Sequence, residues 1–152
     1  MKLISACLLG VKCAWSGDER YQDERALALA RQESLVPVCP EQLGGLSTPR
    51  PPQEIQGGGG EGVLDGRCRV LNKEGVDVTG EFISGARETL KIAQQLNIRE
   101  FIGKARSPSC GCGQVYDGSF SEKLVSGDGV TTALLKRNGI KVSNLEDLMK
   151  LG

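Results

Sequence analysis

Cysteines are the residues of this 152-residue chain with the greatest capacity for chemistry: there are six of them and no histidine. Without histidine, Ser-His-Asp and Cys-His nucleophile systems are excluded, and so are zinc sites with imidazole ligands. Acid–base catalysis would therefore depend on carboxylates, thiols, hydroxyls or lysine. Six cysteines are also too few for a small disulfide scaffold of this length.

The segment before Cys7 is too short for a secretory signal peptide, whose apolar stretch alone has about 7–15 residues. We therefore expect a cytoplasmic protein with reduced thiols, in which grouped cysteines indicate metal binding or catalysis. The chain has no apolar run long enough to span a membrane. Its 19 basic residues balance its 19 acidic ones, which argues against a nucleic-acid partner.

Short apolar runs alternate with helix-forming segments along the chain. Strands are predicted at residues 3–8, 35–39, 100–105 and 140–142, and helices at residues 23–32, 79–96, 131–137 and from 145 onward. This alternation predicts one α/β domain over residues 1–152, with a small, mainly parallel, Rossmann-like sheet flanked by helices. Pro37 suggests an edge position for its strand. A β-hairpin insertion is predicted at residues 67–78, with its turn at residues 72–75.

Glycine is unusually frequent, with 21 residues in the chain, or about twice its average share. Together with prolines, glycines dominate residues 44–62, which we predict to be a long loop. The run Gly57–Gly60 makes this segment a candidate lid over a site.

Three cysteines follow predicted strands. Because the carboxyl ends of parallel strands meet at one edge of a sheet, we expect Cys7, Cys39 and Cys110 to converge there. A single free cysteine is often only a small buried hydrophobe, and this interpretation suits Cys68 best. The roles of Cys13 and Cys112 stay open.

Converging thiolates can hold zinc or an iron–sulfur cluster. A closed zinc site needs four ligands, normally from Cys-x-x-Cys pairs, and this chain has no such pair. A cluster accepts single thiolates from separate loops. Three ligands on a 4Fe–4S cluster leave one iron open to act as a Lewis acid. The spacing alone does not decide between these metals.

Six motifs, in order along the chain, resemble one known family. They are Ser5–Gly10 (SACLLG), 37–41 (PVCPE), 44–50 (GGLSTPR), 107–111 (SPSCG), 116–120 (YDGSF) and 127–131 (GDGVT). Together they resemble the family of small proteins that includes the bacterial 2-thiouracil desulfidases, over nearly the whole chain. After Cys13 the family pattern has an aromatic residue, Asp or Asn, and glycine, whereas this chain reads Ala-Trp-Ser-Gly.

The resemblance implies an α/β enzyme with a 4Fe–4S cluster held by Cys7, Cys39 and Cys110, and catalytic roles for Glu41 and Ser107. The expected reaction removes sulfur from a thiolated pyrimidine such as 2-thiouracil. The substrate sulfur would bind the open iron, water would attack the carbon with help from Glu41, and the sulfur would leave as sulfide. Ser107 would relay a proton or orient the ring. Burial and the negative cluster would favour the protonated form of Glu41.

Other functions remain possible from the residues alone. Glu41 could merely cap a turn after Pro40, and Ser107 could be a turn residue before Pro108. The alternatives are desulfidation of thiouridine in transfer RNA, a non-enzymatic metal-binding module, and a thiol redox protein using Cys110 and Cys112. The balanced charge argues against RNA, and the missing Cys-x-x-Cys spacing argues against the redox protein.

Overall fold

The computed structural model describes the chain from Met1 to Leu151. Its main sheet has four parallel strands in the order β2-β1-β5-β8. Their bounds are β1 Lys2–Ser5, β2 Leu35–Val38, β5 Glu100–Gly103 and β8 Lys141–Asn144. The predicted parallel α/β sheet is therefore confirmed, and β2, which contains Pro37, is an edge strand as expected.

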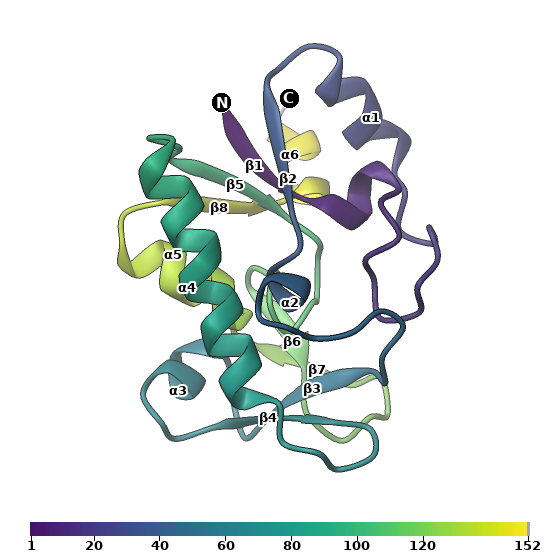
Figure 1. Cartoon of the computed structure of the whole chain (residues 1–152), viewed down its shortest axis with the longest axis vertical. Helices are drawn as coiled ribbons and strands as arrows, with labels where there is room; N and C mark the ends of the chain where they lie inside the picture. The colour runs from purple at the N-terminus through teal and green to yellow at the C-terminus, as the bar shows by residue number, and fades with distance from the viewer. Residues whose placement is uncertain (152) are drawn as a thin grey trace.

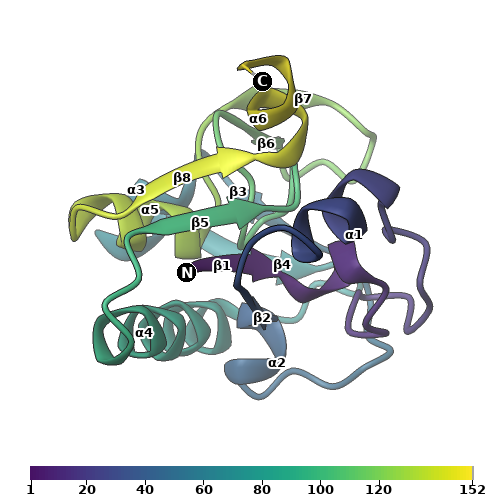
Figure 2. The same ribbon diagram turned by 90° about the horizontal axis from the view of Figure 1, so that it is seen from above.

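Helices cover both faces of this sheet. Figure 2 shows α4 (Thr79–Gln95) on one side and α1 (Glu24–Ala30) and α6 (Leu145–Leu151) on the other. Leu3 and Phe101 pack toward α4 and α5 (Val130–Arg137), against Ala93 and Leu135. The opposite side chains of the same strands pack with Ala26 of α1 and with the start of α6. This alternation of buried side chains is what a strand covered on both faces requires.

β4 (Arg69–Asn72) is the first arm of the predicted hairpin, since Leu71 forms an antiparallel bridge with Asp77 and the N–H of Val78 donates to the Val70 carbonyl at 2.9 Å. β4 also pairs antiparallel with β3 (Gln53–Gln56), which lies inside the segment predicted to be loop. The sequence QEIQ has a single large apolar residue, but Ile55 is fully buried against Val70 and Phe82. Tertiary packing therefore creates a strand where local propensity does not predict one. The β3–β4 pair lies at the end of the molecule opposite α6 (Figure 1).

The glycine run Gly57–Gly60 packs closely against the segment that precedes α5. Gly59 precedes α3 (Gly60–Leu64), and the backbone N–H of Gly60 donates to the Asp128 carbonyl at 2.6 Å. A Cβ on Gly60 would lie 2.3 Å from the Gly129 carbonyl oxygen. The run is thus a close backbone contact, whereas Arg50 and Pro52, from the same predicted loop, line the cavity described below.

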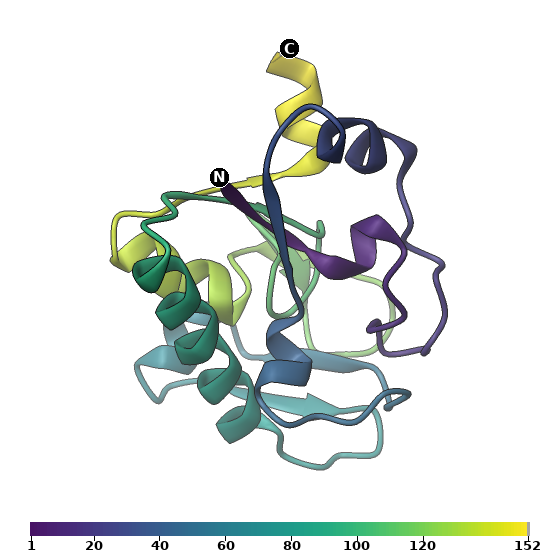
Figure 3. The same ribbon diagram turned by 45° about the horizontal axis from the view of Figure 1, so that its top comes forward.

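Three short elements complete the edge of the sheet where the strands end. A 3-10 helix, η1 (Ala6–Leu9), follows β1, and α2 (Pro40–Leu43) follows β2 beside α4 (Figure 3). β6 (Gln114–Tyr116) and β7 (Leu124–Ser126) form an antiparallel hairpin after β5. Among the described residues, no helix combines the length and apolar character that a bilayer crossing requires.

Candidate functional site

A cavity of about 610 Å³ lies at the carboxyl edge of the sheet, beside the end of β1. Strand order reverses at this point, because the chain goes from β1 to β2 on one side and returns to β5 on the other. Open α/β sheets bind ligands where the order reverses. Cys7 of η1, Cys39 at the start of α2 and Cys110 in the loop after β5 all line this cavity. The predicted convergence of these three cysteines is therefore observed.

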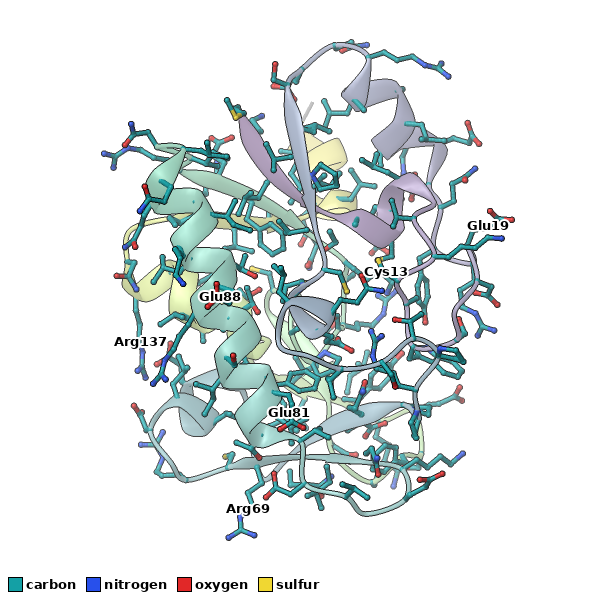
Figure 4. The ribbon with its side chains drawn as sticks, viewed as in Figure 1. Cys13, Glu19, Arg69, Glu81, Glu88 and Arg137 are labelled. Carbon is teal, nitrogen blue, oxygen red and sulfur yellow. The ribbon has the colours of Figure 1, made fainter. Side chains whose placement is uncertain are left out.

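A fourth thiol, Cys13, also lines the cavity and is only 2% exposed. Figure 4 places Cys13 between η1 and α2, whereas Glu19 and Arg137 project from the surface. The Cys39 thiol donates to the Cys13 carbonyl at a sulfur–oxygen distance of 3.6 Å. A hydrogen bond between the two thiols lowers the pKa of Cys39 to about 7 and raises that of Cys13.

The other two cysteines are outside the cavity. The Cys68 side chain lies beside Gly58 and Gly62, in the packing role expected for it. The Cys112 thiol donates to the Val142 carbonyl at 3.5 Å, on a strand of the main sheet. Its backbone is bound to Asn144. Cys112 thus joins the loop after β5 to β8 and takes no part in the cavity.

Burial raises the pKa of both the Cys7 thiol and the Cys110 thiol. Desolvation raises the pKa of Cys7 to about 11, although the neighbouring Lys104 ammonium opposes this rise. Desolvation likewise raises the pKa of Cys110 to about 12. Both groups are therefore thiols at neutral pH in the metal-free protein. Any metal that they bind must displace their protons.

The donor set suits a cluster better than a single ion. Within residues 1–151, no three His, Cys, Asp or Glu side chains come close enough together to hold one metal ion. An iron–sulfur cluster does not require such closeness, because each thiolate binds a different iron. Three thiols from three separate elements, all facing one cavity, are donors of the kind that such a cluster needs.

Glu41 of α2 is buried beside these thiols and is held from two sides. Arg50 donates to its Oε1 from Nε at 3.0 Å and from Nη2 at 2.9 Å. Ser109 donates to its Oε2 at 2.9 Å. Arg50 also donates to the Cys13 carbonyl at 3.0 Å, so it connects Glu41 to the loop that carries Cys13. Arg50 and Glu41 thus form a buried ion pair with two contacts to one carboxylate oxygen.

Ser107 begins a tight turn that carries Cys110. Its Oγ accepts hydrogen bonds from the backbone N–H groups of Ser109 at 3.2 Å and Cys110 at 3.0 Å. Its carbonyl accepts from Gly111 at 2.9 Å. The turn presses against glycines of neighbouring elements, since a Cβ on Gly103 would lie 2.3 Å from the Cys110 carbonyl oxygen. Ser107 is therefore fixed in the wall of the cavity.

Comparisons with known proteins agree with this geometry. Residues 3–147 match the family model of 2-thiouracil desulfurase. The chain belongs to this family. An uncharacterised protein of Bacillus subtilis, YbbK, is 44% identical over 148 residues, which cover 97% of each chain. A solved structure of TudS, described as a [4Fe-4S]-dependent thiouracil desulfidase, has a TM-score of 0.84 and 39% identity, over 98% of this chain and 93% of that one. The family predicted from the six motifs is confirmed.

Aromatic and cationic side chains also line the cavity in this desulfurase-family protein. Trp15 donates from Nε1 to the Tyr21 hydroxyl at 3.1 Å, and Tyr116 and Phe120 also line the cavity. The Lys104 ammonium lies 4.5 Å from the centroid of the Tyr21 ring, and burial lowers its pKa. Lys104 is thus part of the cavity wall.

Two functional candidates, Arg50 and Ser109, were not identified from the sequence. Both lie inside motifs that carry the family resemblance, which was the only available signal for them. Arg50 is nine residues from Glu41, across an irregular loop, and Ser109 is 68 residues from it. No local periodicity indicates pairs of this kind.

Proposed function

We propose that this protein is an iron–sulfur-dependent desulfidase that hydrolyses the carbon–sulfur bond of a thiolated pyrimidine such as 2-thiouracil and releases sulfide. The observation that carries the proposal is the presence of three separate thiols and a paired, buried carboxylate in one cavity. Membership of the 2-thiouracil desulfurase family and the similarity to TudS support it. All six cysteines are free, which suits a reducing compartment such as the cytoplasm.

Cys7, Cys39 and Cys110 would hold a 4Fe–4S cluster with one iron free of protein ligands. When bound, such a cluster supplies a soft Lewis acid with affinity for the substrate sulfur. The elements that carry these thiols are fixed by the main sheet, by α2 and by the turn after Ser107. The ligand positions therefore depend on the fold and not on a flexible segment.

Glu41 would accept a proton from the attacking water. Its Oε1 is occupied by Arg50, so Oε2 is the oxygen that remains for proton transfer. Glu41 would begin the reaction as a base and act as an acid only after it has taken up this proton. Ser107, in the wall of the same cavity, would help to move this proton or orient the ring.

The aromatic lining of the cavity suits a small planar ring. Trp15, Tyr116 and Phe120 offer aromatic faces or edges for stacking against a pyrimidine. Binding would thereby orient the thiocarbonyl toward the thiols. These contacts identify a chemical class and not one particular thiolated base.

The proposal is tested with protein purified and reconstituted without oxygen. We expect about four irons and four sulfides per chain and a broad absorption near 400 nm, both characteristic of a 4Fe–4S cluster. We also expect stoichiometric conversion of 2-thiouracil to uracil and sulfide. Cys7→Ser, Cys39→Ser and Cys110→Ser should each lose iron and activity, whereas Cys68→Ser is the matched control and should keep both.

The alternatives give different results in the same experiment. Colourless protein with stoichiometric zinc and no turnover would favour a metal-binding module. Turnover of thiolated transfer RNA without turnover of 2-thiouracil would identify RNA as the substrate. Iron and activity retained in all three ligand variants would refute the assigned ligands.

A further inference from the structure

Ser109 is a buried hydroxyl that contacts several parts of the site at once. It is 2% exposed, and its Oγ donates to Glu41 Oε2 at 2.9 Å. The same oxygen lies 3.1 Å from Ser107 Oγ and 3.5 Å from Cys110 Sγ. The function proposed above assigns no role to this residue.

The hydrogen-bond partners determine which group donates and which accepts in this series. A serine hydroxyl has one proton and two acceptor lone pairs. The proton of Ser109 points to Glu41, so its oxygen is free to accept the proton of Ser107. Ser107 Oγ already accepts from two backbone N–H groups. Its own proton therefore goes to Ser109, in the order Ser107, Ser109, Glu41.

The contacts of Arg50 determine which carboxylate oxygen of Glu41 accepts the last hydrogen bond of this series. Both of its contacts with Glu41 go to Oε1, and its remaining donors are bound to the carbonyls of Cys13 and Ser47 and to the Thr48 hydroxyl. Oε2 is left to Ser109 as its hydrogen-bond donor. The carboxylate is thus held with a single oxygen toward the two serines.

We propose that Ser109 carries a proton from the attacking water to Glu41, a role that rests on the proposed desulfidase function. Ser107 Oγ has no free lone pair for this proton, because it accepts from two N–H groups. As water adds to the thiocarbonyl carbon, it gives a proton to the remaining lone pair of Ser109 Oγ, which lines the cavity. The Ser109 proton moves to Glu41 Oε2. Ser109 thereby loses one O–H bond and gains one, Ser107 keeps its proton and orients the Ser109 hydroxyl, and Glu41 becomes neutral. The reverse shift returns a proton to the departing sulfur, so no electrons are transferred and no other reactant is needed.

The backbone contacts of Ser109 do not depend on its hydroxyl. Its N–H donates to Ser107 Oγ, and its carbonyl accepts from the N–H groups of Thr131 at 3.0 Å and Thr132 at 3.2 Å. Ser109→Ala keeps all of these backbone contacts and removes the hydroxyl contacts with Ser107, Glu41 and the Cys110 thiol. The variant is therefore expected to fold and to bind the cluster.

The experiment compares Ser109→Ala, Ser107→Ala and the double variant in the cluster-loaded protein, under single-turnover conditions with 2-thiouracil. Thr89→Val is the control, because it removes a hydroxyl that is equally buried but lies in α4, away from the cavity. Iron content and the dissociation constant for 2-thiouracil are measured for every variant. General acid–base steps contribute about 100-fold or more, so Ser109→Ala should lose about that factor in rate with unchanged iron content and affinity.

Residues that act through the same hydroxyl do not have additive effects on the rate when both are replaced. The double variant should therefore be no slower than the slower single variant, instead of showing the product of the two losses. A rate within about threefold of wild type for Ser109→Ala, multiplicative losses in the double variant, or loss of iron from Ser109→Ala would each overturn the relay. If the loaded wild-type protein itself leaves 2-thiouracil intact, the proposed function fails, and the relay fails with it.

Discussion

The contact between α2 and α4 makes a sharp test of how the fold positions the site. The two helices touch at Gly44 and Gly85, where a Cβ on Gly85 would lie 1.9 Å from the Pro40 carbonyl oxygen. Pro40 stands between the predicted ligand Cys39 and the predicted base Glu41. Any change that pushes Pro40 away from α4 therefore displaces both functional residues.

Gly85→Ala tests this contact, and the contact distance gives the displacement that the added methyl group requires. Real Cβ atoms stay at least 3.0 Å from such an oxygen, so the Pro40 peptide would have to move by about 1.1 Å. Overpacking of this kind costs about 1–3 kcal/mol, and the better helix propensity of alanine returns about 1 kcal/mol. We expect a net loss of up to about 2 kcal/mol in the free energy of unfolding, and about a 100-fold loss of desulfidase rate from the misplaced groups.

Gly80→Ala is the matched control on the same helix, because a Cβ there meets no atom within 4 Å. It should leave the unfolding free energy unchanged or raise it by up to about 1 kcal/mol. Both variants are measured by urea unfolding of the reduced, cluster-free protein, and by iron content and 2-thiouracil turnover after reconstitution. If Gly85→Ala matches Gly80→Ala in stability and turnover, the contact does not position the site.

Two further changes probe charge pairs. Arg50→Met should lower the unfolding free energy by about 3–5 kcal/mol, since it leaves a buried carboxylate unpaired. Adding Glu41→Gln should recover part of that loss in a double-mutant cycle; purely additive losses would mean that the pair is not coupled. Asp23→Ala removes the N-cap of α1 and should cost about 0.5–2 kcal/mol at pH 7. Arg25 lowers the pKa of Asp23, so the charge-dependent part of this cost is present above about pH 4 and lost as the pH falls through the folded pKa. Urea unfolding of Asp23→Ala and wild type at pH 7 and at lower pH tests this sign, which an equal or larger difference at low pH would contradict.

The sequence was informative where local pattern determines structure. Alternating strands and helices led to the parallel sheet, and the cysteines after the strands were correctly expected to meet at its edge. β3 could not be predicted, because its burial comes from Ile55 packing against residues of β4 and α4. The same limit applies to the pairing of Glu41 with Arg50 and Ser109, which depends on how loops from different parts of the chain fold together.

The acid–base groups and the thiols of the site differ in how far they are prepared before a metal binds. Glu41, Arg50 and Ser109 satisfy one another's charges and hydrogen bonds without any metal. The thiols of Cys7 and Cys110 instead stay protonated in the metal-free protein, because burial raises their pKa to about 11 and about 12. Cluster binding must therefore overcome the cost of losing these protons, while the carboxylate and serines are already in position. A variant defective only in the acid–base groups should accordingly bind a full cluster, which makes the two sets of groups separable by experiment.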